Sequence, residues 1–330
     1  MKSLIALSAV LALSPLAAHA GALHVADTLK IGGAGGWDYV TVDPVHNRAF
    51  VAHGAAISAV DLGTRQALPA LIAAQGSHIA LPVDGGRTLL VTNGKSNTVT
   101  FNDAVTGAEI ASVATDAKPD AAIIEPVSGN AYVMANGGSA VDVVDVATHA
   151  VVAKIATGGA PEAAAVDGKG LVFTHLEDKN ALVVIDARTH AIKATYALKD
   201  CDEPSGVAFV DAGRLVLSAC RNGIARVTNA DTGAEVATVA IGLHPDGALY
   251  DAKARLGYVP SGDGKLTVIA FDGKPHVVDV VTTRPGARTA ALDPATGHVL
   301  LPVADLTPPA KAGDRPGIVP DSFSILVVGQ

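Results

Sequence analysis

Seven positions of the sequence, spaced 40 to 43 residues apart, carry side chains that could share one site. They are Asp38, His78, Asp120, Glu162, Ser205, Asp246 and Arg288, and six of the seven are ionisable although only 17% of the chain is charged. Four carboxylates that point at one place repel each other unless protons, basic neighbours or a bound cation compensate. Arg288 and His78 would compensate in part. A hard divalent ion such as calcium or magnesium, held by carboxylates and water, would supply the rest.

Other interpretations of these positions stay open. The side chains could be structural clasps that hydrogen-bond the loop of a neighbouring repeat, or they could bind a cationic or polar ligand directly. Histidines could also join carboxylates around zinc, manganese, iron or copper. The members of that second ligand set would be His53, His78, Asp38, Glu162 and His175. No H-x-x-x-H, H-E-x-x-H or C-x-x-C spacing supports it.

Recognised catalytic motifs are missing from the sequence. There is no G-x-S-x-G nucleophile elbow, and the lack of C-x-x-C-H excludes covalently attached haem. The glycines of residues 31–38 (IGGAGGWD) have the wrong spacing for a dinucleotide-binding fingerprint. The sequence therefore identifies no catalytic residue, and a metal-assisted hydrolase or lyase is the enzymatic alternative that remains.

The elements that would position these side chains recur seven times. An acidic residue closes a short apolar run at Asp43, Asp84, Glu125, Asp167, Asp211, Asp251 and Asp293, in steps of 41, 41, 42, 44, 40 and 42 residues. Three more valine-rich runs follow each mark, separated by Gly, Asn or Asp, which predicts four short strands per repeat. No segment shows a 3.6-residue apolar period, so we predict an all-β fold. Seven such repeats are typical of a seven-bladed β-propeller with four-stranded antiparallel blades.

The two ends of the chain complete each other in this pattern. After Asp293 the sequence supplies only a second strand in HVLLPV and a third strand in SFSILVVG, whereas residues 23–33 match the fourth-strand pattern. We therefore predict that the N-terminal strand completes the last blade and closes the ring, which removes an exposed sheet edge. Residues 305–321 are rich in proline and interrupt this blade. We expect a stiff surface loop there, either an ordered insertion without a role or a lid over the axial opening.

The predicted ring decides which side chains meet. First strands line the axis of a propeller, and the loops that lead into them share one face with the loops between second and third strands. The seven ionisable and polar positions would therefore meet at the mouth of the channel on that face. Cys201 precedes the first strand of the fifth blade and Cys220 ends its second strand. Because both lie on the same face, we predict a disulfide, with a free redox or metal-binding pair as the alternative.

Three segments carry a family resemblance: LLVTNGKSNTV (89–99), AYVMANGGSAVDVVDVAT (131–148) and VAKIATGGAPEAAAV (152–166). They resemble the YVTN-repeat β-propellers, close to the exported YncE-like group, and the likeness extends over essentially the whole chain after residue 20. It implies the seven-bladed fold but no activity, because propellers carry unrelated functions. The Asn that ends the second strand, as in Asn93 and Asn136, is replaced elsewhere by His53, His175, Cys220 and Ser261.

Composition and the first residues bear on location and partners. Residues 1–20 (MKSLIALSAVLALSPLAAHA) have the basic start, apolar stretch and A-x-A end of a cleaved signal peptide, which leaves 21–330 as a single domain that is periplasmic or secreted. A net charge of −8 without a Lys/Arg block argues against nucleic acid as a partner. No later apolar run reaches about 18 residues, so we expect no membrane span. A monomer is expected.

These observations favour a binding or scaffold protein. We predict that the exported propeller engages a protein partner or a small polar ligand at the channel mouth. The first alternative is a metal-assisted, lactonase-like hydrolase or lyase at the same mouth. The second is a periplasmic metal-binding or redox-support protein.

Overall fold

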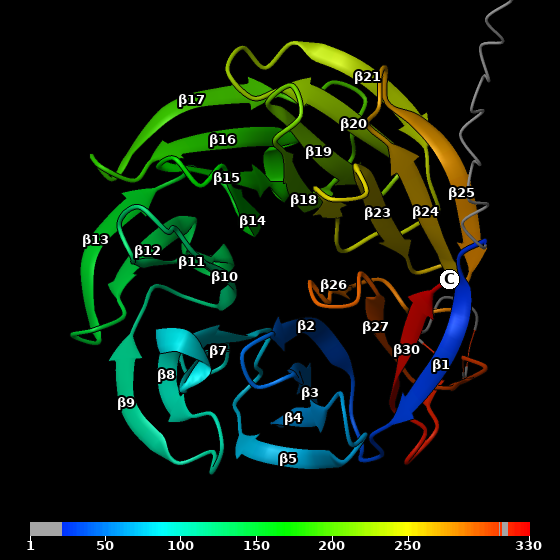
Figure 1. Ribbon diagram of the computed structural model, residues 1–330. Helices are drawn as coiled ribbons and strands as arrows, with labels where there is room; N and C mark the ends of the chain where they lie inside the picture. Colours follow the sequence, from blue (N-terminus) through cyan, green and yellow to red (C-terminus); the bar gives the residue numbers. More distant parts are fainter. Residues whose placement is uncertain (1–21, 310, 312–315) are drawn as a thin grey trace, which may run out of the picture.

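Seven four-stranded antiparallel sheets form a ring around a central axis in the computed structural model, which describes residues 22–309, 311 and 316–330 (Figure 1). This confirms the predicted all-β, seven-bladed propeller. Helical structure in the described part is limited to 3₁₀ turns, at Asp84–Gly86, Asn136–Gly138 and Glu177–Lys179. None of the helices found in those residues is long and apolar enough to cross a membrane.

In the first six blades the strands run in sequence order from the axis outward (Figure 1). The first three blades are β2 (Trp37–Asp43), β3 (Arg48–His53), β4 (Ala56–Asp61) and β5 (Ala67–Ala73); β6 (Ala80–Val83), β7 (Thr88–Asn93), β8 (Thr98–Asp103) and β9 (Glu109–Ala114); and β10 (Pro119–Ile124), β11 (Ala131–Ala135), β12 (Ala140–Asp145) and β13 (Ala150–Ala156). The fourth and fifth are β14 (Pro161–Val166), β15 (Leu171–Leu176), β16 (Ala181–Asp186) and β17 (Ala191–Ala197); and β18 (Pro204–Val210), β19 (Leu215–Cys220), β20 (Ile224–Asn229) and β21 (Glu235–Ala240). The sixth is β22 (Leu249–Asp251), β23 (Leu256–Ser261), β24 (Lys265–Ala270) and β25 (His276–Thr282).

The seventh blade joins the two ends of the chain. Its strands lie in the order β26 (Ala291–Leu292), β27 (Val299–Val303), β30 (Ser324–Gly329) and β1 (His24–Lys30). β1 pairs with β30 from His24 opposite Gly329 to Lys30 opposite Ser324. The predicted closure by the N-terminal strand is therefore confirmed.

The core lies between the blades. Every position of β7 is buried, as is every position of β15, because the middle strands are covered on both faces by neighbouring sheets. The outermost strands, such as β13, instead alternate between exposed and more buried positions. Large side chains from consecutive blades fill the gaps, among them Phe50, Phe101, Tyr132 and Phe173, all without exposed surface. A blade thus depends on its neighbours for most of its apolar burial.

The acidic marks of the repeat cap turns. Asp43 Oδ1 accepts a hydrogen bond of 2.9 Å from the Val45 amide, and Glu125 Oε1 accepts one of 3.0 Å from the Val127 amide. Comparable bonds reach Asp167, Asp251 and Asp293 from the amides two residues further on. A short acceptor at this place holds the turn between the first and second strands, which explains why the mark recurs.

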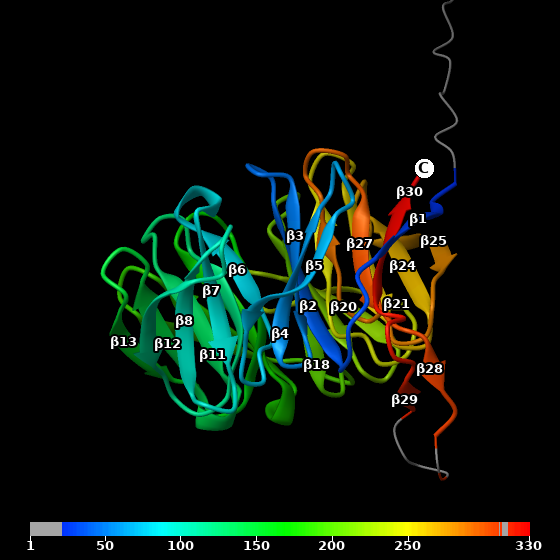
Figure 2. The same cartoon turned by 90° about the horizontal axis from the view of Figure 1, so that it is seen from below.

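The proline-rich segment 305–321 contains a short pair of strands. β28 (Leu306–Thr307) pairs with β29 (Gly317–Ile318), and this pair projects from the ring beside β27 and β30 (Figure 2). Asp321 fastens its base, since Gly33 N donates to Asp321 Oδ1 at 3.0 Å and Asp321 N donates to Gly33 O at 3.1 Å.

Candidate functional site

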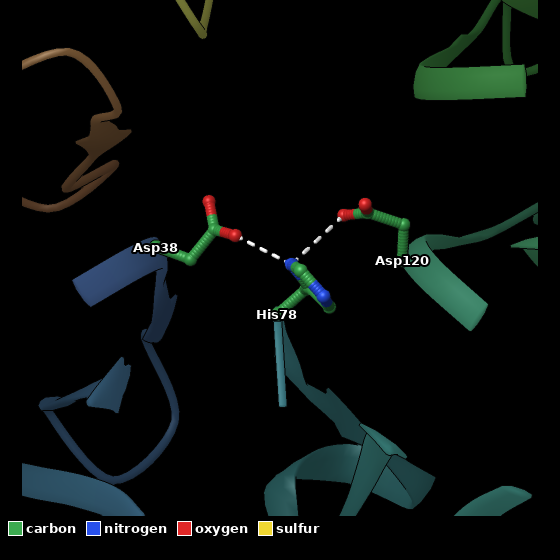
Figure 3. A group of neighbouring side chains, drawn as sticks. All are labelled: Asp38, His78 and Asp120. Atoms are coloured by element: carbon green, nitrogen blue, oxygen red, sulfur yellow. Dashed lines mark hydrogen bonds and ion pairs between the residues drawn. The ribbon is translucent and has the colours of Figure 1, made fainter. Parts of the chain in front are cut away.

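Three side chains from consecutive blades meet near the axis. Asp38 in β2, His78 just before β6 and Asp120 in β10 point toward one another (Figure 3). His78 Nδ1 lies 2.6 Å from Asp38 Oδ2 and 3.4 Å from Asp120 Oδ1. These were three of the seven positions that the repeat spacing singled out.

The backbone explains why such positions face the axis. Strand pairing is irregular between Trp37 and Val40 in β2, and again between Pro119 and Ala122 in β10. The same irregularity recurs at Pro161–Ala164 and Pro204–Val207. A bulge leaves its residues out of the ladder and re-aims their side chains. Proline fits at the start of these strands because it cannot donate to the ladder.

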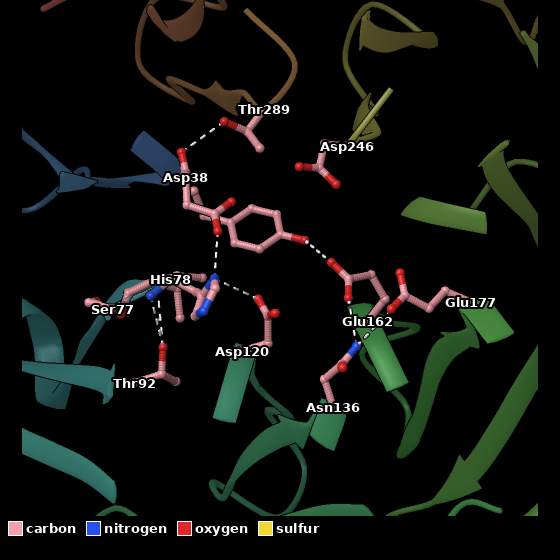
Figure 4. Close-up of polar contacts among 12 residues, drawn as sticks. Asp38, Ser77, His78, Thr92, Asp120, Asn136, Glu162, Glu177, Asp246 and Thr289 are labelled. Carbon is pink, nitrogen blue, oxygen red and sulfur yellow. Dashed lines mark hydrogen bonds and ion pairs between the residues drawn. The ribbon is translucent and has the colours of Figure 1, made fainter. Parts of the chain in front are cut away.

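A second group of contacts is centred on Glu162 in β14. Asn136 Nδ2 donates to Glu162 Oε2 and to Glu177 Oε1, both at 3.1 Å (Figure 4). The Tyr39 hydroxyl donates to Glu162 Oε1 at 3.4 Å. Two carboxylates of the fourth blade therefore share the side-chain amide of Asn136 from the third blade, and the first blade adds the phenol of Tyr39.

The remaining charged pair comes from the sixth and seventh blades. Arg288 Nε lies 2.7 Å from Asp246 Oδ2, and the Arg288 side chain keeps 46% of its surface exposed. We call Asp38, His78, Asp120, Glu162, Glu177, Asp246 and Arg288 the mouth cluster. It contains five carboxylates and two basic groups, so negative charge is in excess unless protons or a bound cation balance it.

Burial and mutual repulsion shift the pKa values of the mouth cluster. Burial raises the pKa of Asp120 to about 7, although the charge of His78 opposes the rise. Burial likewise raises the pKa of Asp246 to about 6, against the effect of Arg288. Burial and the charges of Asp120 and Asp246 raise the pKa of Glu162 well above its usual value. Asp120 and Asp246 can therefore hold or exchange protons near neutral pH.

The pKa of His78 is also raised, but for a different reason. Burial alone would lower its pKa, but the hydrogen bond to Asp38 and the charge of Asp120 outweigh that effect and raise it to about 9. The imidazole is then a cation between two carboxylates at neutral pH. The backbone of this residue is also held, since Tyr39 N donates to His78 O at 3.1 Å and His78 N donates to Thr92 Oγ1 at 3.4 Å.

Sequence reasoning missed Tyr39. Its side chain packs against apolar clusters of the second to fifth blades, although it belongs to the first blade. Burial and the charge of Glu162 raise its pKa well above the usual value. A signal did exist, because the residue that follows each predicted site position is otherwise Ile79, Ala121, Ala163, Gly206, Gly247 or Thr289. Only the first repeat places a large polar ring there.

Ser205 fits the clasp interpretation. Its buried hydroxyl donates a hydrogen bond of 2.8 Å to the Pro245 carbonyl of the next blade's entry loop. The carboxylates behave differently. Among the described residues, no backbone amide donates to the side chains of Asp38, Asp120, Glu162 or Asp246. These carboxylates contact other side chains instead. Ser205 thus joins two blades through a side-chain hydrogen bond to a loop carbonyl.

The structure does not bring His53 or His175 to the mouth cluster. The His53 ring stacks on Phe323 with centroids 3.8 Å apart, and its Nδ1 lies 3.2 Å from Ser58 Oγ. His175 has no exposed surface, and its Nε2 lies 2.8 Å from Ser218 Oγ. His53 ends β3 and His175 is the penultimate residue of β15, and both strands are one strand further from the axis than the first strand of their blade. The ligand set that needed them is not assembled.

Cys201 and Cys220 form the predicted disulfide, 19 residues apart in the sequence. Both residues are without exposed surface. The alternative of a free redox or metal-binding pair is wrong for this structure. A disulfide of this kind is consistent with an oxidising compartment.

The fold was compared with known proteins. No family model and no curated protein matches the sequence. Among solved structures, the chain is similar to Kuenenia stuttgartiensis hydrazine synthase at 17% identity, over 81% of this chain and 92% of that one, with a TM-score of 0.70. It is similar to the RRP9 WD40 repeats at 12% identity, over 92% and 97%, with a TM-score of 0.74. A chain of the mitotic checkpoint complex gives 15% identity, 91% and 95%, and a TM-score of 0.69. These identities support the propeller fold alone.

Proposed function

We propose that this protein is a binding or scaffold module that engages a ligand or protein partner through the mouth cluster. One observation carries the proposal: five carboxylates and two basic groups from six blades converge at one end of the axis. Part of that group stays accessible, since the side chains of His78 and Arg288 are 36% and 46% exposed. Convergent charged groups on a rigid frame are typical of ligand sites. The propeller fold itself commonly mediates protein interactions.

Family and location belong to the same proposal. We assign the chain to the YVTN-repeat propellers on the segments 89–99, 131–148 and 152–166. We also propose that residues 1–20 are a cleaved signal peptide, although they lie outside the described residues, and that 21–330 work as one monomeric, exported domain. The buried disulfide supports an oxidising compartment.

Site-specific crosslinking tests the proposed binding face. A photoreactive amino acid replaces Gln75, which is exposed in the loop before β6, and in a matched variant it replaces Val127, 51% exposed in the turn after β10 on the opposite face. We expect adducts from position 75 alone in the export compartment. They should disappear when Glu162→Gln and Asp246→Asn remove two acidic groups of the mouth cluster. Equal adducts from both positions, or adducts that survive the double variant, would contradict the proposal.

A metal-assisted hydrolase or lyase is the second candidate, and one feature favours it. Burial raises the pKa of Asp120 to about 7, so this carboxyl group could give or take a proton near neutral pH. Purified protein would be assayed against lactone and ester substrates. Turnover that is lost in Asp120→Asn and retained in an exposed control, Asp272→Asn, would identify this activity.

A further inference from the structure

Three residues of the mouth cluster have the arrangement of a metal site. Asp38, His78 and Asp120 each offer a ligand atom, and the three atoms lie within 4.8 Å of one another (Figure 3). The other acidic members already have partners. Glu162 receives the Tyr39 hydroxyl and the Asn136 amide, and Asp246 is paired with Arg288.

One atom of this triple lacks a hydrogen-bond partner. Asp120 Oδ1 is buried and accepts no hydrogen bond among the described residues, while it lies 3.4 Å from His78 Nδ1. A buried carboxylate oxygen without a donor is costly unless something else satisfies it. A cation beside His78 would contact this oxygen directly. It would also offset the excess of carboxylates around it.

The backbone holds all three ligands in place before any ion binds. Asp38 O accepts a hydrogen bond of 2.8 Å from Thr289 Oγ1 of the seventh blade. The neighbouring amide of Ile79 donates to Thr92 Oγ1 at 3.2 Å, which fixes the loop that carries His78. Asp120 directly follows Pro119, whose ring restricts the start of β10. Such support keeps the ligands close and lowers the cost of ordering them.

We propose that Asp38, His78 and Asp120 bind one borderline transition-metal ion of the zinc type. The nitrogen ligand decides the class, because calcium and magnesium prefer all-oxygen sites, whereas imidazole with carboxylates suits zinc, manganese or iron. This proposal replaces the calcium or magnesium ion that the carboxylates alone suggested. The inference rests on the proposed function only in that it concerns the same face of the propeller.

Metal uptake by the mature protein tests this directly. The protein is stripped with a chelator and then equilibrated separately with zinc, cobalt, calcium and magnesium, and bound metal is counted by mass spectrometry. We expect about one equivalent of zinc or cobalt and none of calcium or magnesium at the same free concentration. Bound cobalt should show an absorption spectrum that reports a nitrogen–oxygen ligand field.

Variants connect the ion to these residues. His78→Ala and Asp120→Asn should each weaken zinc binding by at least about tenfold. His244→Asn is the matched control, because His244 is exposed on the same face with a φ of 55°, which Asn tolerates. Circular dichroism of the stripped proteins checks that every variant is folded. Uptake that survives both His78→Ala and Asp120→Asn, failure of the wild type to bind zinc, or equal uptake of calcium would overturn the proposal.

Its failure can be told apart from failure of the proposed function. Zinc uptake is measured on the isolated protein, whereas crosslinking from position 75 is measured with its partner present. A protein that gives the adduct from position 75 but takes up no zinc keeps the proposed function and loses only the metal site. A protein that binds zinc but gives no adduct from position 75 keeps the metal site and loses the binding function.

Discussion

Tyr39 in the first blade and Glu162 in the fourth meet across the propeller axis, with the phenol oxygen 3.4 Å from Glu162 Oε1. Blades three places apart in a ring of seven lie on opposite sides, so a single side chain links both sides of the mouth cluster. Small residues make room for it, since Ala121 and Ala163 occupy the equivalent positions of the third and fourth blades. The mouth is therefore shaped by one residue that breaks the repeat.

We expect Tyr39→Phe to lower the free energy of unfolding by about 1 kcal/mol, because Glu162 loses a largely buried hydrogen bond while the ring is kept. Urea denaturation at neutral pH measures the change. Tyr196→Phe is the matched control, since its hydroxyl donates to the Asp231 carbonyl at an exposed site. A larger loss in Tyr196→Phe than in Tyr39→Phe would show that the Tyr39–Glu162 contact contributes little.

The repeat made the fold predictable. Asp43, Glu125, Asp167, Asp251 and Asp293 recur because each accepts a hydrogen bond from the amide two residues on, and this turn fixes where the next strand begins. The closure followed because residues 23–33 supply the strand that the last repeat lacks. The pairing of β28 with β29 was not predictable, since two residues on each side give no alternating pattern.

The sequence predicted where the site lies, but only some of the residues that belong to it. Spacing identified Asp38, His78 and Asp120 because first strands line the axis in every blade. The His53 ring stacks on Phe323, which the sequence could not show. The sequence pattern around a histidine at the end of a strand is the same whether its side chain faces the channel or a neighbouring blade. Tyr39 was missed because strand alternation predicts that only one of two consecutive residues faces the axis, whereas at the irregular pairing in β2 both Asp38 and Tyr39 do.

His175 should make the protein less stable in mild acid. Burial lowers its pKa to about 4, whereas in the unfolded chain it titrates near 6.5. Between these values the unfolded state binds more protons, so the free energy of unfolding falls as the pH drops from about 6.5 to about 4, by roughly 3 kcal/mol from this residue. His175→Gln, which can still contact Ser218, should remove that part of the slope in urea titrations.

A matched variant isolates the contribution of His175. His276 is exposed in β25, so His276→Gln changes the same residue type without burial. The slope of stability against pH should be the same in His276→Gln as in the wild type. If His175→Gln also keeps the wild-type slope, burial of this imidazole is not what destabilises the protein in acid.

Removing the disulfide should be costly. Cys201 and Cys220 enclose a loop with a sequence separation of 19, and opening it restores chain entropy worth about 3 kcal/mol to the unfolded state. Thermal denaturation of Cys201→Ala/Cys220→Ala, compared with oxidised wild type, measures the loss. Because alanine also leaves space in a buried site, wild type reduced in denaturant and refolded provides the control. If the thermal midpoint is unchanged in both the double variant and the reduced wild type, the disulfide does not contribute to stability.

Glu162 should make the protein less stable as the pH rises. Burial and the charges of Asp120 and Asp246 raise its pKa in the folded state, so the folded protein holds the proton more tightly than the unfolded chain. That stabilisation is complete below the unfolded pKa of about 4.5 and is lost as the pH rises through the folded pKa. Glu162→Gln stays uncharged, so its free energy of unfolding relative to wild type should increase from pH 5 to pH 9. Glu109→Gln in β9 is exposed and should show a constant difference over the same range. A constant difference for Glu162→Gln as well would mean that folding does not raise the pKa of Glu162.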